Sequence, residues 1–202
     1  MISLRGADLL VATGNAGKLE EFSVLLAPYG SKIHSLTDLG LPEPDETEPS
    51  FAGNALLKAH AGAKASGMPT LADDSGLVVA DLNGAPGIFT ADWAETSSGR
   101  DFGLAMSKTW SMLRAVHGGP VRRAEFRCVL AVALPTGEDA IFAGRLHGQI
   151  VWPMRGSLGH GYDPIFQPDG FSMTLGELAL DIKNQISHRA DAFRALISGC
   201  FM

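Results

Sequence analysis

The sequence predicts an α/β fold with a mixed β-sheet, and two features indicate it. An apolar run at residues 9–13 precedes helical spacing over residues 19–26, so the chain begins with a strand, a loop and a helix. Further along, apolar and charged residues alternate over 123–128, and a Pro-Thr-Gly turn at 135–137 leads into residues 140–152. This pattern is typical of a long antiparallel hairpin. A chain that holds both kinds of unit is expected to form a mixed sheet.

Three further helices follow from capping and periodicity. Ser50 can cap a helix that runs to about residue 66, with Gly67 just beyond its end. An apolar stripe over residues 102–116 has helical spacing and predicts a second helix. Ser187 can cap a last helix that Gly199 terminates.

Composition and charge narrow the class of protein. The 202 residues are 46% hydrophobic, which is enough for a substantial core, and no linker or repeat divides them, so we expect one domain over residues 1–202. A net charge of -6 disfavours non-specific nucleic-acid binding, which needs many Lys and Arg residues. No apolar run approaches the roughly 18 to 20 residues of a membrane-spanning helix, and the first residues lack the apolar core of a secretion signal. We therefore expect a cytoplasmic protein that binds neither nucleic acid nor membrane.

A glycine-bearing loop that ends in lysine is the first candidate binding site. Its residues are Thr13, Gly14, Asn15, Ala16, Gly17 and Lys18. Backbone amides at the start of a helix can converge on an anion, and the lysine adds a positive charge, so the loop suits a phosphate. It is not a P-loop, because its glycines are too close together and Leu19 follows the lysine. The same residues also fit an ordinary strand-to-helix turn.

Adjacent carboxylates, Asp73 and Asp74, form the second candidate. Strand pieces at 70–72 and 77–82 flank them, so we expect the pair at a strand end. Because side chains alternate along a strand, one aspartate is expected to face a site while the other supports the turn. Magnesium usually takes one or two protein carboxylates alongside substrate phosphates, so this sparse set is sufficient. Glu46 is the candidate second ligand, although these acids also fit solvated turn and loop positions.

Polar residues elsewhere could complete a site. Asn54 and Lys58 are four residues apart on the helix after Ser50 and therefore share a face. The segment Gly161-Tyr162-Asp163 follows a glycine-containing loop, which lets backbone approach a flat ligand, although it also fits a tight turn. Three hydrogen-bond donors complete the group, namely Lys183, His188 and Arg189. His188 and Arg189 fall in the first turn of the final helix. A charged helix end on the surface is the plainer alternative.

The order and separation of these motifs match one known pattern. Along the chain they are TGNAGK at 13–18, a glutamate before NALLKA at 54–59, ADDSGL at 72–77 with GAPG at 84–87, GYDPIF at 161–166, and Lys183 before SHR at 187–189. Over about residues 9 to 195, the chain resembles the inosine/xanthosine triphosphate pyrophosphatase family, the Ham1/RdgB-like housecleaning enzymes.

The resemblance implies a fold and an activity. The fold is an elongated α/β structure whose long mixed sheet and flanking helices form two lobes, with the active-site cleft between the lobes, and the protein is a homodimer. The activity is Mg2+-dependent hydrolysis of non-standard purine nucleotides (ITP, dITP and XTP) to the nucleoside monophosphate and pyrophosphate, which cleanses the nucleotide pool.

The resemblance also assigns roles position by position. Asp74 is the catalytic and metal-binding carboxylate, and Glu46 falls where a second metal ligand is expected. The implied substrate-binding residues are Thr13, Gly14, Asn15, Ala16, Gly17, Lys18, Asn54, Lys58, Ser75, His160, Gly161, Tyr162, Asp163, Lys183, His188 and Arg189. Three positions depart from the family pattern: His160 replaces a base-stacking phenylalanine, Gly53 replaces a common glutamate, and Asp92 stands where arginine is frequent.

Three other functions fit parts of the pattern. A Maf-like nucleotide pyrophosphatase would act on other bases, and a nucleotide-binding module would bind without hydrolysis, although Asp74 and Lys18 speak against the latter. A P-loop kinase or NTPase is disfavoured by Leu19 and the glycine spacing.

Overall fold

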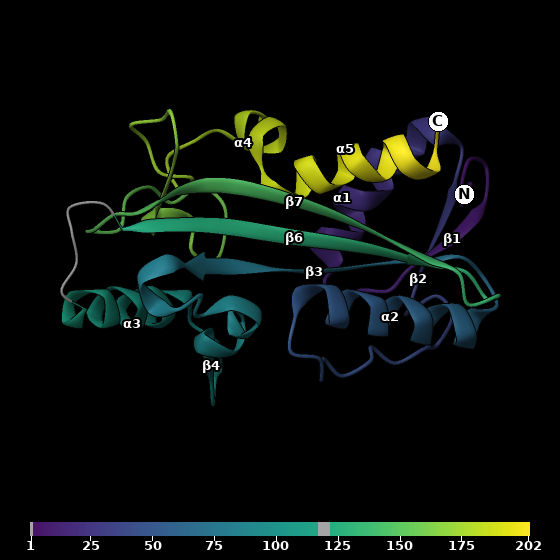
Figure 1. The fold of residues 1–202 in the computed structure, drawn as a ribbon, viewed down its shortest axis with the longest axis horizontal. Helices are drawn as coiled ribbons and strands as arrows, with labels where there is room; N and C mark the ends of the chain where they lie inside the picture. Colours follow the sequence, from purple (N-terminus) through teal and green to yellow (C-terminus); the bar gives the residue numbers. More distant parts are fainter. Residues whose placement is uncertain (1, 117–121) are drawn as a thin grey trace. The chain divides into compact units, whose positions relative to one another are not determined.

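The structure, a computed structural model, describes residues 2–116 and 122–202. Six strands form one sheet in the order β2-β1-β3-β6-β7-β8 (Figure 1). Strand β1 pairs in parallel with β2 and β3, whereas β7 pairs antiparallel with β8, so the predicted mixed sheet is confirmed. The bounds of these strands are β1 Asp8–Val11, β2 Lys32–Ser35, β3 Thr70–Val79, β6 Arg123–Ala133, β7 Asp139–Ile150 and β8 Phe166–Pro168.

Five α-helices accompany the sheet in the described part of the chain. They are α1 Ala16–Leu26, α2 Phe51–Ser66, α3 Phe102–Ala115, α4 Leu180–Ile186 and α5 His188–Cys200. A small separate hairpin pairs β4 Glu95–Thr96 with β5 Gly99–Arg100. Among the helices of residues 2–116 and 122–202, none has the length and apolar character needed to cross a membrane.

The chain divides into two compact units. Unit 1 comprises Met1–Asp74, Cys128–Gly144 and Ala192–Met202, and unit 2 comprises Ser75–Arg127 and Arg145–Asp191. Each unit has its own cluster of buried apolar side chains. Strands β3, β6 and β7 contribute residues to both units.

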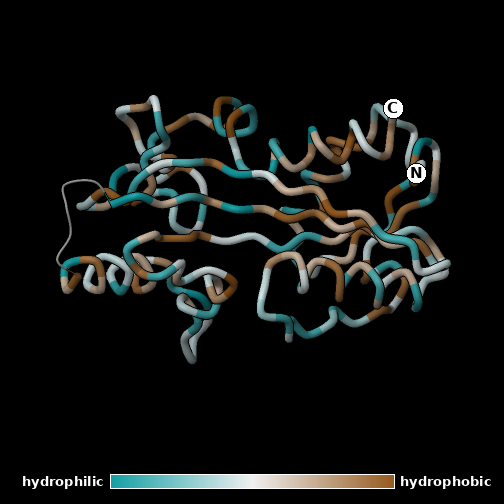
Figure 2. Tube along the Cα trace, in the orientation of Figure 1, coloured by the Kyte–Doolittle hydropathy of each residue, from teal (hydrophilic) through white to brown (hydrophobic). Residues whose placement is uncertain are grey.

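Unit 1 packs helices on the strands that carry the lysine loop. Alternate residues of β1, including Leu9 and Val11, share a cluster with Phe22 of α1 and Leu196 of α5. Helix α2 lies on the opposite side of the strands from α5 (Figure 1), and the strands between them are largely hydrophobic (Figure 2). A Cβ atom at Gly62 of α2 would lie 2.7 Å from Thr70 Cγ2, so this helix approaches the sheet closely. The absence of a side chain permits that approach.

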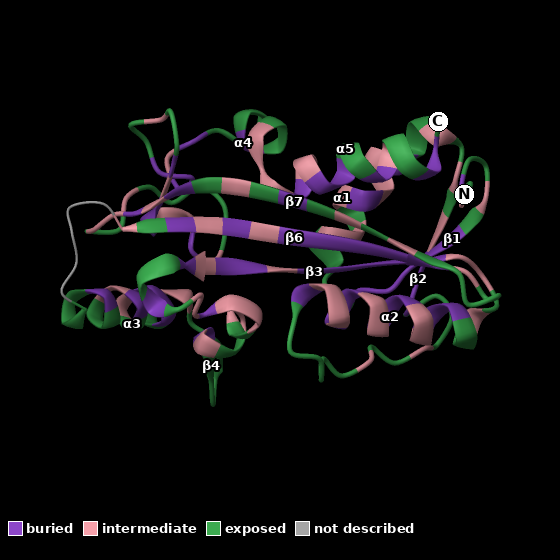
Figure 3. Cartoon of the chain, viewed as in Figure 1, coloured by how far each residue is buried: buried purple, intermediate pink, exposed green. Residues whose placement is uncertain are grey.

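Unit 2 has a more aromatic core. Tyr162 and Phe166 are fully buried there, and the rings of Trp110 and Trp152 stack at 5.6 Å. Along β6 burial alternates over the first residues and becomes continuous from Cys128 onward (Figure 3). Alternation is typical of a strand covered on one face, and continuous burial of a strand covered on both.

Most of the expected elements are confirmed. The Ser50 side chain caps α2 by accepting a hydrogen bond from Gly53 N, and Gly67 ends that helix in the left-handed conformation. The Ser187 hydroxyl accepts from Ala190 N at 3.1 Å in the first turn of α5. Strands β6 and β7 are sheet neighbours joined by a short turn, in which Leu134 N donates to Glu138 O at 2.8 Å. A connection this short requires the predicted antiparallel hairpin.

Two sequence expectations were wrong. Strand β3 runs without interruption from Thr70 to Val79, so Asp73 and Asp74 lie within a strand and not at its end. Pairing of β3 within the sheet overrides the turn preference of the Asp-Asp-Ser-Gly sequence. Helix α5 also continues one residue past Gly199, to Cys200.

Candidate functional site

The lysine loop lies at the junction of β1 and α1, as the sequence predicts. Strand β1 ends at Val11 and α1 begins at Ala16, with Asn15 as its N-cap. The Asn15 side chain accepts a hydrogen bond from Lys18 N at 3.2 Å, and Thr13 Oγ1 accepts one from Asn15 N at 3.2 Å. A side chain at Gly14 would overlap the Glu43 carboxylate, so the loop is tightly placed. The turn is thus ordered by its own polar side chains.

The two aspartates of β3 point to opposite faces of the strand. The Asp73 carboxylate forms an ion pair with Lys18 Nζ at 2.7 Å. Asp74 Oδ2 accepts a hydrogen bond from Asn54 Nδ2 of α2 at 3.1 Å. The expected alternation is confirmed, but neither aspartate supports a turn, because both lie within the strand.

Asp74 belongs to a polar group at the start of α2. Asn54 and Lys58 are both buried on that helix, and Lys58 Nζ contacts the Glu46 carboxylate. Asn54 Oδ1 in turn accepts from Glu48 N at 2.9 Å, which ties the preceding loop to the helix. The structure therefore brings together Asp74, Asn54, Lys58 and Glu46, as the sequence predicts.

The electrostatics of this group disfavour negative charge on Asp74. Burial and, next, the charge of Glu46 raise the pKa of Asp74 to about 6, although the Asn54 hydrogen bond and two lysines act in the opposite direction. Burial alone would lower the pKa of Lys58, but its hydrogen bond to Glu46 and the neighbouring carboxylates raise it. Lys58 is therefore a fixed cation beside two acids that repel each other.

These residues fit a divalent cation. Two carboxylates near each other, one of them destabilised by burial, are stabilised when a cation lies between them. Carboxylate oxygens are the ligands that Mg2+ prefers, and it usually takes one or two from a protein. In the described residues no group of three or more His, Cys, Asp or Glu side chains could hold a metal. Asp74 and Glu46 are thus the two carboxylates of this group that could hold a divalent cation.

Unit 2 holds the second predicted group, around Asp163. The Asp163 carboxylate accepts hydrogen bonds from Lys183 Nζ at 3.2 Å and from His160 N at 3.3 Å. Gly159 has a φ of +91°, and a side chain there would overlap both Asp163 Oδ2 and Lys183 Nζ. Gly161 is also left-handed, with a φ of +65°. The loop thus needs glycine at these positions to close around the Asp163–Lys183 pair.

Tyr162 anchors this loop in the core. Its hydroxyl donates to Thr90 O at 3.2 Å, and its ring meets Phe102 edge-on at 5.9 Å. Burial raises the pKa of the Tyr162 hydroxyl, so it stays protonated. Its side chain is therefore structural, whereas the neighbouring His160 is exposed.

The predicted donors Lys183, His188 and Arg189 lie on the last two helices, α4 and α5. Lys183 lies on α4, a helix that the sequence analysis missed, and both Lys183 and Arg189 are buried. The His188 ring stacks on Phe126 of β6 at 5.0 Å and 15°. Sequence reasoning missed this contact, although it placed Phe126 on the correct strand. Ser75 is half-buried in β3, next to Asp74 in the chain.

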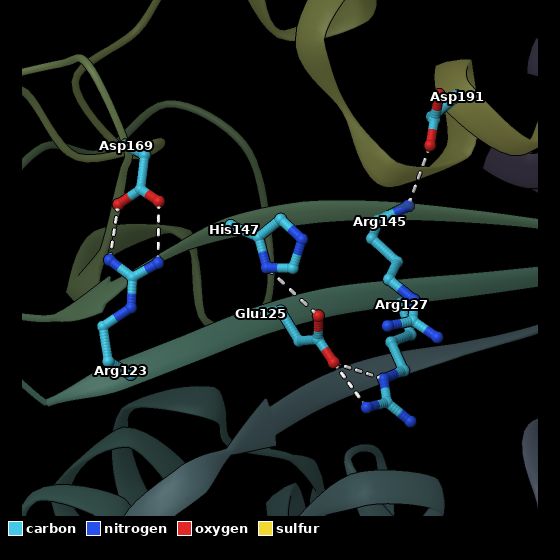
Figure 4. Close-up of polar contacts among 7 residues, drawn as sticks. All are labelled: Arg123, Glu125, Arg127, Arg145, His147, Asp169 and Asp191. Carbon is cyan, nitrogen blue, oxygen red and sulfur yellow. Dashed lines mark hydrogen bonds and ion pairs between the residues drawn. The ribbon is translucent and has the colours of Figure 1, made fainter.

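A groove of about 350 Å³ lies in unit 2. Its polar lining is Arg123, Glu125, Arg127 and His147 (Figure 4). Glu125 pairs with Arg127 at 2.5 Å and with His147 at 3.2 Å. Arg123 Nη1 and Nη2 each donate to Asp169 at 2.8 Å. None of the residues that line it was predicted as a site residue.

Fold and site together define an α/β protein equipped for a phosphorylated ligand. Residues 9–199 match the Ham1 family, and the chain belongs to that family. A dITP/XTP pyrophosphatase of Ruegeria pomeroyi is 50% identical over 196 residues, which cover 97% of this chain and 96% of the relative. One of Brucella melitensis is 47% identical over 205 residues, covering 96% and 93%. A solved HAM1 protein from Coxiella burnetii superimposes with a TM-score of 0.90 at 35% identity, covering 96% of this chain and 98% of that one.

Proposed function

We propose that this chain is a Mg2+-dependent pyrophosphatase that converts ITP, dITP and XTP to the nucleoside monophosphate and pyrophosphate. The observation that carries the proposal is the group formed by the buried Asp74, Asn54 and Lys58 with the exposed Glu46, beside the lysine loop in unit 1. The names of the relatives in Ruegeria and Brucella support the choice of substrate.

The phosphates are the ligands for unit 1. The backbone of residues 13–18 and the ammonium of Lys18 supply donors and positive charge for a triphosphate. Lys58 is buried and its raised pKa keeps it charged at neutral pH, so it adds a second cation. Asp74 and Glu46 would hold Mg2+, which when bound neutralises charge on phosphate oxygens and polarises a water molecule.

Asp74 then acts on the nucleophile. A carboxylate at this position can orient the water that attacks the α-phosphorus, while the bond to the bridging oxygen breaks and pyrophosphate leaves. The Asn54 amide donates to one Asp74 oxygen and so fixes the direction of the carboxylate. A carboxylate engaged by a cation is a weak base, so orientation is the role we assign to it.

Hydrogen bonding to the base accounts for the choice of purine. Hypoxanthine and xanthine carry an oxygen acceptor where adenine carries an amino donor. Arg189 and His188 are donors, so an adenine would face donor against donor and leave buried groups unpaired. Mismatches of this kind can reject an analogue by about 10⁴ in sites built on hydrogen bonds. Guanine shares the keto oxygen and must be rejected at its 2-position.

A pyrophosphate-release screen with Mg2+ tests the proposal. Wild type is expected to release pyrophosphate from dITP, ITP and XTP and much less from ATP, and Asp74→Asn should reduce the rate by about 100-fold or more. Equal release by wild type and Asp74→Asn would overturn the catalytic role. Preferred turnover of UTP or TTP would favour the Maf-like alternative, and orthophosphate as product would favour γ-phosphate chemistry. Nucleotide binding without any product would favour a binding module.

The remaining expectations are part of the same proposal. We propose a cytoplasmic homodimer that binds its nucleotide substrate and neither nucleic acid nor membrane. Light scattering should give about twice the chain mass of 21.3 kDa. A mass of one chain at micromolar concentration would contradict the dimer and leave the catalytic proposal intact.

A further inference from the structure

We infer that Asp73 is a positioning residue whose carboxylate holds the Lys18 ammonium in place for the phosphates of the substrate. The inference rests on the proposed function in one respect, because it takes those phosphates to be the phosphates of a nucleotide. Asp74 is the aspartate to which the family pattern gives a role, so Asp73 would be a second functional acid in the same strand.

The geometry of the pair supports this role. Asp73 Oδ2 and Lys18 Nζ are 2.7 Å apart, which is the distance of a close ion pair. The Asp73 side chain is 1% exposed and the Lys18 side chain is 23% exposed. The carboxylate is therefore fixed inside the protein, while the lysine extends from a loop to reach it.

The two partners differ in how much they depend on each other. A buried carboxylate is costly without a cation nearby, whereas a partly exposed lysine is solvated without help. An ammonium group has three donors, so the ion pair with Asp73 leaves at least two that can meet phosphate oxygens. Lys18 thus gains a fixed position and retains donors for a ligand.

A fixed lysine binds phosphate more tightly than a mobile one. Lysine loses considerable rotamer freedom when it is ordered, and a residue that is ordered beforehand does not lose it on binding. Asp73 lies on the face of β3 opposite to Asp74, which is bonded to Asn54. Its contact is therefore different from that of Asp74, although both aspartates also interact electrostatically with Lys58.

A double-mutant cycle tests the inference. The variants are Asp73→Asn, Lys18→Met and the double variant, and the readouts are kcat and KM for dITP and the Kd of inorganic tripolyphosphate by calorimetry with Mg2+ present. Asp73→Asn is expected to raise the KM and the Kd by about tenfold while kcat changes by less than about threefold. In the Lys18→Met background, Asp73→Asn should change the Kd by less than about twofold.

Independent and multiplying effects of the two substitutions would overturn the inference, because they would mean that Asp73 does not act through Lys18. Thermal unfolding of each variant shows whether it is folded at the assay temperature. If Asp73→Asn does not fold, ¹³Cε relaxation of the wild-type protein tests the same point: Lys18 should be rigid and the exposed Lys32 mobile. A Lys18 side chain as mobile as Lys32 would contradict the inference.

The two proposals fail in different ways. A wild-type protein that releases no pyrophosphate from dITP would refute the proposed function. The tripolyphosphate cycle and the relaxation measurement need no hydrolysis, so they would still decide the role of Asp73.

Discussion

At the scale of single residues, Asp74 shows a conflict between activity and stability. It is buried next to a second acid, and its pKa in the folded protein is raised from 3.8 to about 6. Functional sites commonly retain such unfavourable charges, since the geometry that binds a ligand is not the one that is most stable without it. The charge of Asp74 is expected to be stabilised when cations arrive with the substrate.

Removing the Asp74 charge should therefore stabilise the empty protein. Between pH 3.8 and about 6 the folded state binds a proton that the unfolded state does not, so stability falls as the pH rises through about 6. In metal-free buffer at pH 8, Asp74→Asn is expected to gain about 1–3 kcal/mol, or about 3–8 °C in Tm. The gain should vanish below about pH 3, where the wild-type carboxyl is protonated in both states.

Thermal scans at the two pH values check this, with Asp45→Asn as the control in an exposed loop. The control should shift Tm by less than about 1 °C. An Asp74→Asn protein that is less stable than wild type at pH 8 would show that the carboxylate is stabilised by groups other than those described above.

At the scale of elements, the loop before Tyr162 depends on glycine. Gly159 combines a left-handed φ with close contact to Asp163 and Lys183. Gly170 has a similar φ of +81°, but no heavy atom lies within 4 Å of the position that a Cβ atom would take. Comparing substitutions at the two positions therefore distinguishes the effect of backbone strain from the effect of steric overlap.

Alanine substitution of these glycines should give different results. Gly159→Ala is expected to raise the KM for dITP by about tenfold or more, because the new Cβ would displace the Asp163–Lys183 pair. Gly170→Ala should leave the KM within about twofold of wild type, although it shares the backbone cost. Equal KM values for the two variants would mean that the pair does not contribute to nucleotide binding.

Helix α2 offers a second test at this scale. In an ordinary helix, glycine to alanine gains about 1 kcal/mol. At Gly62 the added Cβ would lie 2.7 Å from Thr70 Cγ2 and 3.1 Å from Leu10 Cδ2, and overpacking of this kind costs about 1–3 kcal/mol. Gly62→Ala should therefore lower the free energy of unfolding measured in urea. A gain in stability would show that α2 can move away from the sheet at little cost.

The sequence predicted elements well where the local signals were strong. Ser50 and Gly67 bound α2 as expected, because a cap and a left-handed glycine act locally. Strand β3 was divided in error, because its Asp-Asp-Ser-Gly segment has the composition of a turn. Helix α4 was missed because it is short, and its N-cap, Ala179, makes no capping hydrogen bond through its side chain.

At the scale of the whole molecule, charge limits the partners of the protein. A net charge of -6 repels a polyanion at long range, while Lys18 and Lys58 act within a small region of unit 1. The described cations of the groove in unit 2 are paired with acids, as Figure 4 shows for Arg123 and Arg127. A few local cations can thus bind a single triphosphate, while the negative charge of the whole protein disfavours binding of nucleic acid.

Duplex DNA should therefore not bind. With a labelled duplex at 150 mM salt, fluorescence anisotropy is expected to stay unchanged up to about 10 μM protein, a concentration at which non-specific DNA-binding proteins begin to saturate. Saturable binding that weakens with added salt would contradict this expectation. Binding of dITP under the same conditions would serve as the positive control.

The sequence by itself determined the family, the mixed sheet and the identity of the polar residues, since motif order, capping and periodicity are local properties of the chain. Only the tertiary structure decided what those residues contact. It paired Asp73 with Lys18 and Asp74 with Asn54, and it stacked His188 on Phe126. The physical reason is that pairing and burial depend on groups distant in the chain, and local propensity contains no information about them.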